Sequence, residues 1–463
     1  MNINDTIKYL NVGLPDDIRR CQMAGNFDEA IRLTDLRLQQ DNIADCLRNS
    51  LIAHRRIFQI LPTVFPYSKD DALAIIRKDI PDYTGEELQE QMDLRNIRWI
   101  FVNGQVRINY LFYASMLKAV PGFAARARKK LGGVESATTG TVEAQRLDIS
   151  MRKMKEKGSL TNRIRIRATI KLKDEHFIPG MFIRAHLPVP APCQQQSDIR
   201  IEKIWPETGM IAPEDAAQRT VCWEETMLDN HEFLVEYSYT HTAVYKDAYH
   251  GKGQSSDLRC DTEEIAPHVV FTPYIRALCA ELTEGIEDPL MKARAFFDFI
   301  TLNMKYTFMP SYFALEDIAD SCAKNYTGDC GVFALLFITM CRCVGIPAQW
   351  QSGMTAEPDF IGCHDWVRFY VEPYGWIFAD PSYGTGAVRL GKEERRQFYF
   401  GNLDPYRMVA NRQFQADFTI PKEHWRADPY DSQMGEIETS DRGFYYNEFD
   451  HSMDILCCEE ITD

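Results

Sequence analysis

Residues 326–350, YTGDCGVFALLFITMCRCVGIPAQW, place a glycine-flanked cysteine directly before an apolar segment. The side chains spaced for burial on one helical face are Val332, Leu335, Leu336, Thr339 and Cys343. Gly345 and Pro347 then predict the end of this helix, as a glycine cap followed by proline. We expect Cys330 at or just before the first turn, where the helix dipole and free N–H groups favour a thiolate. The same N–H groups can stabilise an oxyanion, so the segment predicts an attacking cysteine.

A candidate base follows in residues 362–384, GCHDWVRFYVEPYGWIFADPSYG. Two runs of strand character flank a turn at Pro373-Tyr374-Gly375 and predict an antiparallel hairpin. In that hairpin His364 and Asp380 lie at the same end. A carboxylate beside an imidazole fixes its tautomer, as in nucleophile–base–acid arrangements.

These blocks, in this order, resemble the transglutaminase-like superfamily. The matching segments are GDCGVFA at 328–334, GIPA at 345–348, HDW at 364–366 and GWIFADP at 375–381. The resemblance covers about residues 265–390 and implies a papain-like α+β core with a Cys–His–Asp triad. It implies that Cys330 is the nucleophile, His364 the general base and acid, and Asp380 the group that orients the histidine.

Several residues near these blocks carry further expectations. Asp365 stands where the family more usually has a small residue, which bears on substrate entry. Trp366 and Trp376 are candidates for walls of an acyl site, although packing in the core explains either one alone. Lys305-Tyr306 resembles a short strand start found upstream of the nucleophile, and Tyr306 is a third candidate substrate-binding residue.

The predicted fold class is α+β, with the papain-like transglutaminase core preceded by an antiparallel β domain and an N-terminal helical region. The expected divisions are a helical region at 1–130, a linker or connecting helix at 131–159, the β domain at 160–245, the core at 263–425 and an acidic C-terminal tail at 426–463. The alternation of residues 163–172 gives one strand of the β domain a basic face, Arg163, Arg165 and Arg167.

The helical region contains a possible winged-helix-like unit. Thr84 and Glu87 form a capping-box pattern, and Asn103-Gly104 between two short apolar runs is typical of a type I′ hairpin. The helix of this unit is acidic where a DNA-recognition helix is basic. We therefore expect a packing or protein-interaction module.

Composition restricts the class of protein. The chain of 463 residues carries a net charge of −15, which disfavours nucleic-acid partners. No signal-peptide pattern and no apolar stretch of membrane-spanning length is visible, so we expect no membrane association and a cytoplasmic location. The 13 cysteines lack paired CxxC spacing, and we expect reduced thiols, no metal and no cofactor.

The expected reaction is hydrolysis of a peptide or amide substrate through a thioester on Cys330, as in a cysteine peptidase or amidase. One alternative is transamidation, in which an amine replaces water. Another is a catalytically inactive scaffold, because the family includes members that lost catalysis. The residues do not specify the substrate or an oligomeric state.

Overall fold

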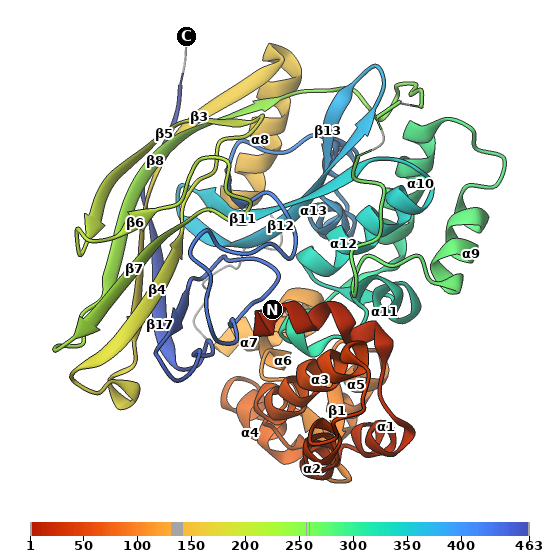
Figure 1. Ribbon diagram of the computed structural model, residues 1–463. Helices are drawn as coiled ribbons and strands as arrows, with labels where there is room; N and C mark the ends of the chain where they lie inside the picture. Colours follow the sequence, from red (N-terminus) through yellow and green to blue (C-terminus); the bar gives the residue numbers. More distant parts are fainter. Residues whose placement is uncertain (1, 131–141, 256, 259, 462–463) are drawn as a thin grey trace.

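The computed structural model describes residues 2–130, 142–255, 257–258 and 260–461. Residues 131–141, the first part of the expected linker, lie outside them, and most of the second part is helix α8 (Val142–Lys157). Figure 1 shows an N-terminal helical unit below, a β-sandwich on one side and a mixed core on the other. The two secondary-structure types meet in the core, so the α+β prediction is confirmed.

The N-terminal unit packs seven helices, a 3₁₀ helix and one hairpin around two small apolar clusters. Its elements are η1 (Ile3–Val12), α1 (Asp16–Met23), α2 (Phe27–Leu38), α3 (Asp45–Val64), α4 (Lys69–Asp79), α5 (Gly85–Asp93), β1 (Trp99–Val102), β2 (Gln105–Ile108), α6 (Phe112–Ala119) and α7 (Pro121–Lys130). Asn103 and Gly104 have φ values of 50° and 75°, so the expected left-handed turn joins β1 to β2. Thr84 and Glu87 form the predicted capping box of α5.

The β-sandwich consists of two four-stranded sheets. One has the order β17-β3-β8-β5 and the other β16-β4-β7-β6, with every pairing antiparallel. The strands are β3 (Ser159–Leu172), β4 (Met181–Pro188), β5 (Gln196–Trp205), β6 (Met210–Ile211), β7 (Thr220–Met227), β8 (Phe233–Val244), β16 (Glu436–Glu438) and β17 (Phe449–Glu460). The basic face of β3 is partly neutralised, because Arg165 and Arg167 each bind Glu236 at 2.8 Å.

The segment expected to be a tail supplies one strand to each sheet of the sandwich. β17 pairs with β3 from Phe449↔Leu172 to Glu460↔Asn162. An irregularity between Ile455 and Cys457 interrupts this ladder and shifts the inward face by one residue. That shift breaks the two-residue alternation that would have marked β17 as a strand in the sequence.

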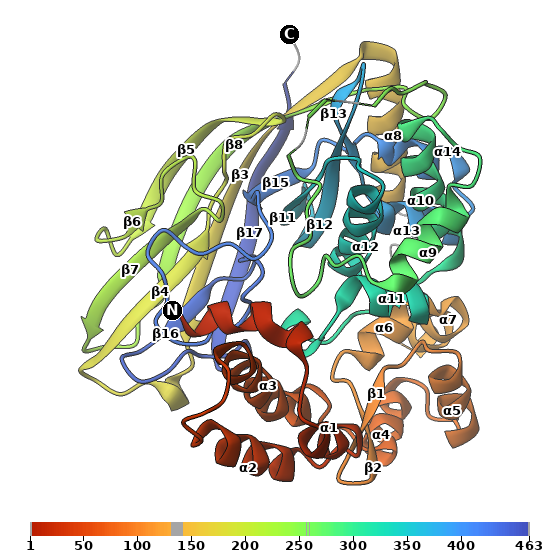
Figure 2. The ribbon, with the colours of Figure 1, turned by 45° about the vertical axis from the view of Figure 1, so that its right-hand side comes forward.

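The core holds an antiparallel sheet of order β14-β13-β12-β11-β15 with helices packed against it (Figure 2). Its elements are α9 (Pro273–Leu282), α10 (Pro289–Asn303), β9 (Lys305–Tyr306), η3 (Tyr312–Ala314), α11 (Ile318–Asn325), β10 (Thr327–Gly328), α12 (Cys330–Cys343), β11 (Ala348–Glu357), β12 (Phe360–Val371), β13 (Gly375–Ala379), α13 (Pro381–Arg389), α14 (Glu393–Phe398), β14 (Phe400–Gly401) and β15 (Arg407–Asn411). Helix α12 is buried from Gly331 to Arg342, and Phe337 packs on Phe369 of β12. This apolar seam fixes the start of α12 relative to the sheet.

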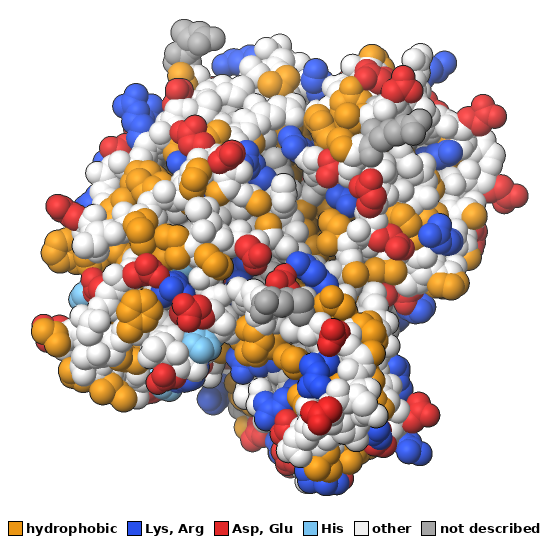
Figure 3. Space-filling view, in the orientation of Figure 1, with side chains coloured by type: hydrophobic (Ala, Val, Ile, Leu, Met, Phe, Trp, Pro, Cys, Tyr) orange, Lys and Arg blue, Asp and Glu red, His pale blue; other side chains and the backbone are white. Residues whose placement is uncertain are grey.

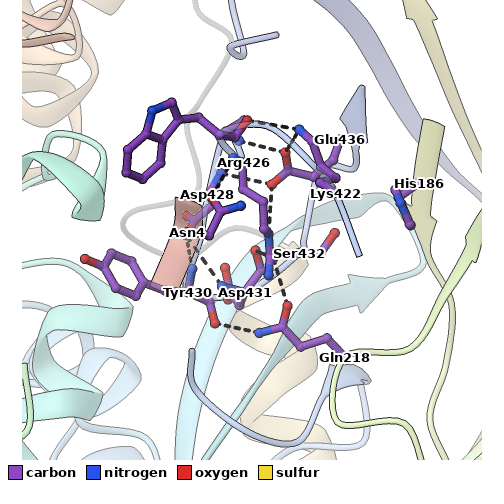
Figure 4. A network of polar contacts seen from close by, with 12 residues as sticks. Asn4, His186, Gln218, Lys422, Arg426, Asp428, Tyr430, Asp431, Ser432 and Glu436 are labelled. Atoms are coloured by element: carbon purple, nitrogen blue, oxygen red, sulfur yellow. Dashed lines mark hydrogen bonds and ion pairs between the residues drawn. The ribbon is translucent and has the colours of Figure 1, made fainter. Parts of the chain in front are cut away.

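Residues 412–435, here called the strap, connect β15 to β16 and contact all three parts of the molecule. The buried carboxylate of Glu436 holds one end of the strap: it accepts hydrogen bonds from Lys422 Nζ (2.9 Å) and from the N–H groups of Ala427 and Asp428. Arg426 extends the network, since its guanidinium donates to Gln218 Oε1 of the sandwich (2.8 Å). The backbone N–H of Arg426 donates to Asn4 Oδ1 of η1 (2.9 Å), as Figure 4 shows. The strap is therefore a buried polar junction between the sandwich, the N-terminal unit and the core.

On the face drawn in Figure 3, acidic and basic side chains are interspersed over both the sandwich and the core. Among the helices of the described ranges, none has both the length and the apolar composition that a membrane span needs.

Candidate active site

Cys330 is the first residue of α12, as the sequence predicts. Asp329 caps the helix and accepts hydrogen bonds from the N–H groups of Val332 (3.3 Å) and Met309 (3.1 Å). The Tyr312 hydroxyl donates to the same carboxylate. Through these bonds Asp329 fixes the backbone on both sides of the half-buried thiol.

The Cys330 thiol donates a hydrogen bond to Asp365 Oδ2 over 3.2 Å. Gly331 makes this approach possible: a Cβ there would lie 2.8 Å from Asp365 Oδ2 and 2.3 Å from the Tyr312 hydroxyl oxygen. Asp365 and Tyr312 thus close over the start of α12. The residue that departs from the family pattern is in direct contact with the sulfur.

Burial raises the pKa of the Cys330 thiol well above its usual value, and the charges of Asp365 and Asp329 raise it further. The field of Lys118 acts in the opposite direction. Burial and the two neighbouring carboxylates thus act against the helix dipole, which by itself favours a thiolate at the helix start.

His364 and Asp380 lie together at the open end of the β12–β13 hairpin. His364 Nε2 is 2.7 Å from Asp380 Oδ2, and both side chains are buried. The hairpin has the register expected from the sequence, with Val367 opposite Ala379 and Val371 opposite Gly375. The two side chains are therefore positioned by local strand pairing.

Arg407 of β15 forms an ion pair with Asp380 and is the third member of this buried group. Its guanidinium, fully buried, lies 2.9 Å from Asp380 Oδ2 and also binds Asp404 at 2.5 Å. Although burial acts to raise the pKa of Asp380, His364 and Arg407 lower it below its usual range. Burial lowers the pKa of His364; Asp380 opposes this effect and the charge of Arg407 adds to it.

A neutral imidazole beside an ionised carboxylate carries its proton on the nitrogen that faces the carboxylate. In His364 that nitrogen is Nε2, so Nδ1 is left with a lone pair that can accept a proton. Among the hydrogen bonds of the described residues, the sulfur of Cys330 pairs with Asp365 and not with His364. The structure thus brings His364 to Asp380 but gives the thiol a different partner.

The three candidate substrate-binding aromatics have different surroundings. Trp366 is fully buried and its Nε1 donates to Gln351 Oε1 (2.9 Å), which is a packing position. Trp376 lies at the turn end of β13, against Tyr370 and Arg368, at the opposite end of that strand from Asp380. Tyr306 lies beside Cys330: burial and the charge of the sulfur both raise the pKa of its phenol.

The strap reaches the site through Gln433. Its side-chain amide donates to Asp365 Oδ1 (2.9 Å) and to the carbonyl oxygens of His364 (3.1 Å) and Gly353 (3.2 Å). Asp431 of the strap lies near Asp365. Burial raises the pKa of both carboxyls, that of Asp431 to about 6; the charge of Asp431 raises the pKa of Asp365 further, whereas a hydrogen bond with Asp365 lowers that of Asp431. The strap therefore holds Asp365 in position through Gln433 and raises its pKa through Asp431.

Among the residues of this site to which the sequence assigned no role are Asp365 as thiol partner, Arg407 and Lys118. Asp365 had a signal, since it departs from the family pattern beside His364. Arg407 and Lys118 had none, because each comes from a segment without a motif and reaches the site through tertiary packing. In the described part of the chain, no group of three or more His, Cys, Asp or Glu side chains is arranged to hold a metal ion.

The sequence of this chain also matches a known protein family. A sequence model of the transglutaminase-like superfamily matches residues 276–381, from α9 to the residue after Asp380. No curated protein matches the chain significantly.

Three solved structures are similar over parts of the chain. A proposed cysteine protease from Cytophaga hutchinsonii is 17% identical with a TM-score of 0.42, covering 66% of this chain and 92% of its own. The periplasmic domain of TgpA from Pseudomonas aeruginosa is 15% identical with a TM-score of 0.28, covering 55% and 96%. A proposed protease from Parabacteroides distasonis is 13% identical with a TM-score of 0.23, covering 46% and 42%. On the family match and the motifs it contains, residues 276–381 of this chain are a transglutaminase-like core.

Proposed function

We propose that the chain hydrolyses an amide or peptide-like bond through a thioester on Cys330. The family match supports a cysteine-dependent enzyme in broad terms. The observation that carries the finer proposal is the buried His364–Asp380 pair at 2.7 Å, on strands adjoining the helix that begins with Cys330. A histidine oriented by a buried carboxylate is what a thiol needs as its base.

In the proposed reaction the S–H proton passes to His364 Nδ1 as the sulfur attacks the amide carbon. The C–N bond breaks, His364 returns the proton to the leaving amine, and an acyl-thioester remains on Cys330. Water then attacks the thioester with His364 as base, which releases a carboxylic acid and restores the thiol. The N–H groups at the start of α12 are the available donors for the oxyanion.

The hydrogen bond from Cys330 to Asp365 defines the resting state of this cycle. A neutral thiol and a neutral imidazole are the protonation states that the burial and charges of the site favour. Attack therefore requires the thiol to exchange Asp365 for His364 as its hydrogen-bond acceptor. Substrate entry beside Asp365 is the step at which we expect this exchange.

The test is a screen of peptide and amide substrates with wild type, Cys330→Ala and the neighbouring-thiol control Cys363→Ala. Turnover by wild type and Cys363→Ala, together with loss in a folded Cys330→Ala sample, supports the proposal. Adding a primary amine distinguishes the alternative, because transamidation would convert the acyl group to a new amide instead of an acid. An inactive scaffold would give no turnover and no acyl-enzyme mass on Cys330.

A further inference from the structure

Two cations from different parts of the molecule lie near Tyr306 at the edge of the site. Lys118 lies in the last turn of helix α6 of the N-terminal unit, and Arg389 ends helix α13 of the core. Both helices pack against the short strand β9, which carries Tyr306. Lys118 Nζ lies 4.0 Å from the centre of the Tyr306 ring and 5.1 Å from that of Phe308. We call Lys118 and Arg389 the basic pair.

The basic pair is close to the reacting sulfur. Tyr306 lies between Lys118 and Cys330. Its ring faces the Lys118 ammonium, and besides burial the charge of the Cys330 sulfur raises the pKa of its phenol. The fields of Cys330 and Asp329 act on Lys118, and the field of Lys118 acts on Cys330 and His364. A group bound between the two cations would therefore lie beside the nucleophile.

Among the ion pairs and hydrogen bonds between described residues, no carboxylate binds Lys118 or Arg389, although both side chains are exposed. By contrast, the buried cation of the site, Arg407, binds two aspartates. Two neighbouring positive charges repel each other, and an anion between them removes that repulsion.

We propose that Lys118 and Arg389 form a carboxylate-binding subsite, so that the preferred substrate is an amide that carries a carboxylate near the bond to be cleaved. This inference deepens the proposed function and rests on it. The carboxylate comes either from the end of a peptide or from an acidic side chain. In either case the N-terminal unit supplies part of the substrate site through Lys118.

The chemistry of Cys330 offers a test that needs no known substrate. Iodoacetate and iodoacetamide both alkylate a thiol with loss of iodide, and they differ in that iodoacetate carries a carboxylate. The measurement is the rate of each reagent at Cys330, resolved from the other 12 cysteines by peptide mapping. Exposed Cys46 in the same sample is the internal reference. The ratio of the two rates cancels any change in the thiolate fraction of Cys330.

We expect the iodoacetate-to-iodoacetamide ratio at Cys330 to exceed that at Cys46. Lys118→Gln or Arg389→Gln should lower the Cys330 ratio about threefold each, and the double variant about tenfold. Salt at 0.5 M should move wild type toward the double variant, because a contact between exposed charges is screened. The matched control is Lys305→Gln, which removes a charge from the same strand β9 where the amine binds Leu94 O instead of facing the site.

Equal ratios in wild type and the double variant would overturn the subsite while leaving Cys330 as a reactive nucleophile. Failure of both reagents to label Cys330 at any pH would overturn the proposed function, and the subsite with it. Once a peptide substrate is known, two analogues separate the two sources of the carboxylate: one with an amidated C-terminus and one with Gln in place of Glu. The carboxylate that binds the basic pair is the one whose removal raises KM for the wild-type protein but not for the double variant.

Discussion

The Cys330 thiol donates to Asp365 Oδ2, and the residue before Asp365, His364, is held by Asp380 at 2.7 Å. Two neighbouring positions on β12 thus hold the proposed nucleophile and the proposed base in separate hydrogen bonds. For attack the sulfur must leave Asp365. The position of the sulfur is therefore set by an acid that is not part of the predicted triad.

Replacing Asp365 by Ala, the kind of small residue more usual in the family, should activate the thiol. Removing the acceptor and its charge lowers the pKa of Cys330, so more thiolate is present at neutral pH. A shift of about one pKa unit would raise the alkylation rate at pH 7 about tenfold. The measurement is the pH profile of iodoacetamide labelling at Cys330, with Asp441→Ala, an exposed aspartate, as control. An unchanged profile would mean that Asp365 does not control the protonation of the sulfur.

Asp380→Asn should keep the fold and cut turnover about 10–10³-fold, with His364→Ala more severe. Asparagine is a weaker acceptor for the His364 Nε2–H group than aspartate, so it no longer keeps the imidazole proton on Nε2. His364 Nδ1 is then less often unprotonated and able to accept the thiol proton. The readout is kcat/KM for both variants, beside the alkylation rate of Cys330. If Asp380→Asn equals wild type in both measurements, Asp380 serves only as the cap of α13. In that role its carboxylate accepts a hydrogen bond from the Tyr383 N–H at 2.8 Å.

Arg407→Gln should lower the free energy of unfolding by about 3–5 kcal/mol at pH 7, because it leaves the buried carboxylates of Asp380 and Asp404 without their cation. Although burial acts to raise it, Arg407 lowers the pKa of Asp404, as it does that of Asp380. A carboxyl with a lowered folded pKa stabilises the fold above its unfolded pKa, about 3.9, and loses that contribution as the pH falls through the folded pKa.

The difference between wild type and Arg407→Gln should therefore be constant from pH 7 to about 5 and shrink below about 4. Urea unfolding of both proteins at several pH values measures it. A difference that grows on acidification would show that Arg407 does not stabilise these carboxylates in the ionised form.

Gln433→Ala should loosen the strap over the site without unfolding the chain. The side-chain amide makes three hydrogen bonds to the His364, Asp365 and Gly353 positions, each worth about 0.5–1.5 kcal/mol. Hydrogen exchange should quicken in residues 412–435 and at the start of β12, while exchange in α12 stays slow. Gln415→Ala, elsewhere in the strap, is the control, and equal exchange in both variants would argue against Gln433 as the anchor.

Turnover should be insensitive to metal removal, because no step of the proposed reaction uses a metal ion. Treatment with EDTA followed by desalting should leave kcat/KM within about twofold of the untreated enzyme. Loss of activity that zinc or calcium restores would contradict the mechanism.

The parts of the site that the sequence predicted are those that local structure determines. A helix that starts at Cys330 follows from its apolar spacing, and His364 meets Asp380 because one short hairpin carries both. Arg407 and Lys118 could not be placed, since their positions depend on how β15 and α6 pack against distant segments. The contact of Asp365 with sulfur depends on the close packing that Gly331 allows, which a motif does not report.

The pairing of β3 with β17 has a consequence for biosynthesis. Leu172 pairs with Phe449, so 276 residues of chain lie between the end of β3 and the start of β17. While the ribosome makes the intervening core, the outer edge of β3 is an unpaired strand of 14 residues with isoleucines on its inner face. Long-range pairing of this kind is slow, and exposed strand edges invite aggregation. We therefore expect nascent chains stalled before residue 449 to require chaperones, and a synthetic peptide of residues 449–460 to rescue their solubility.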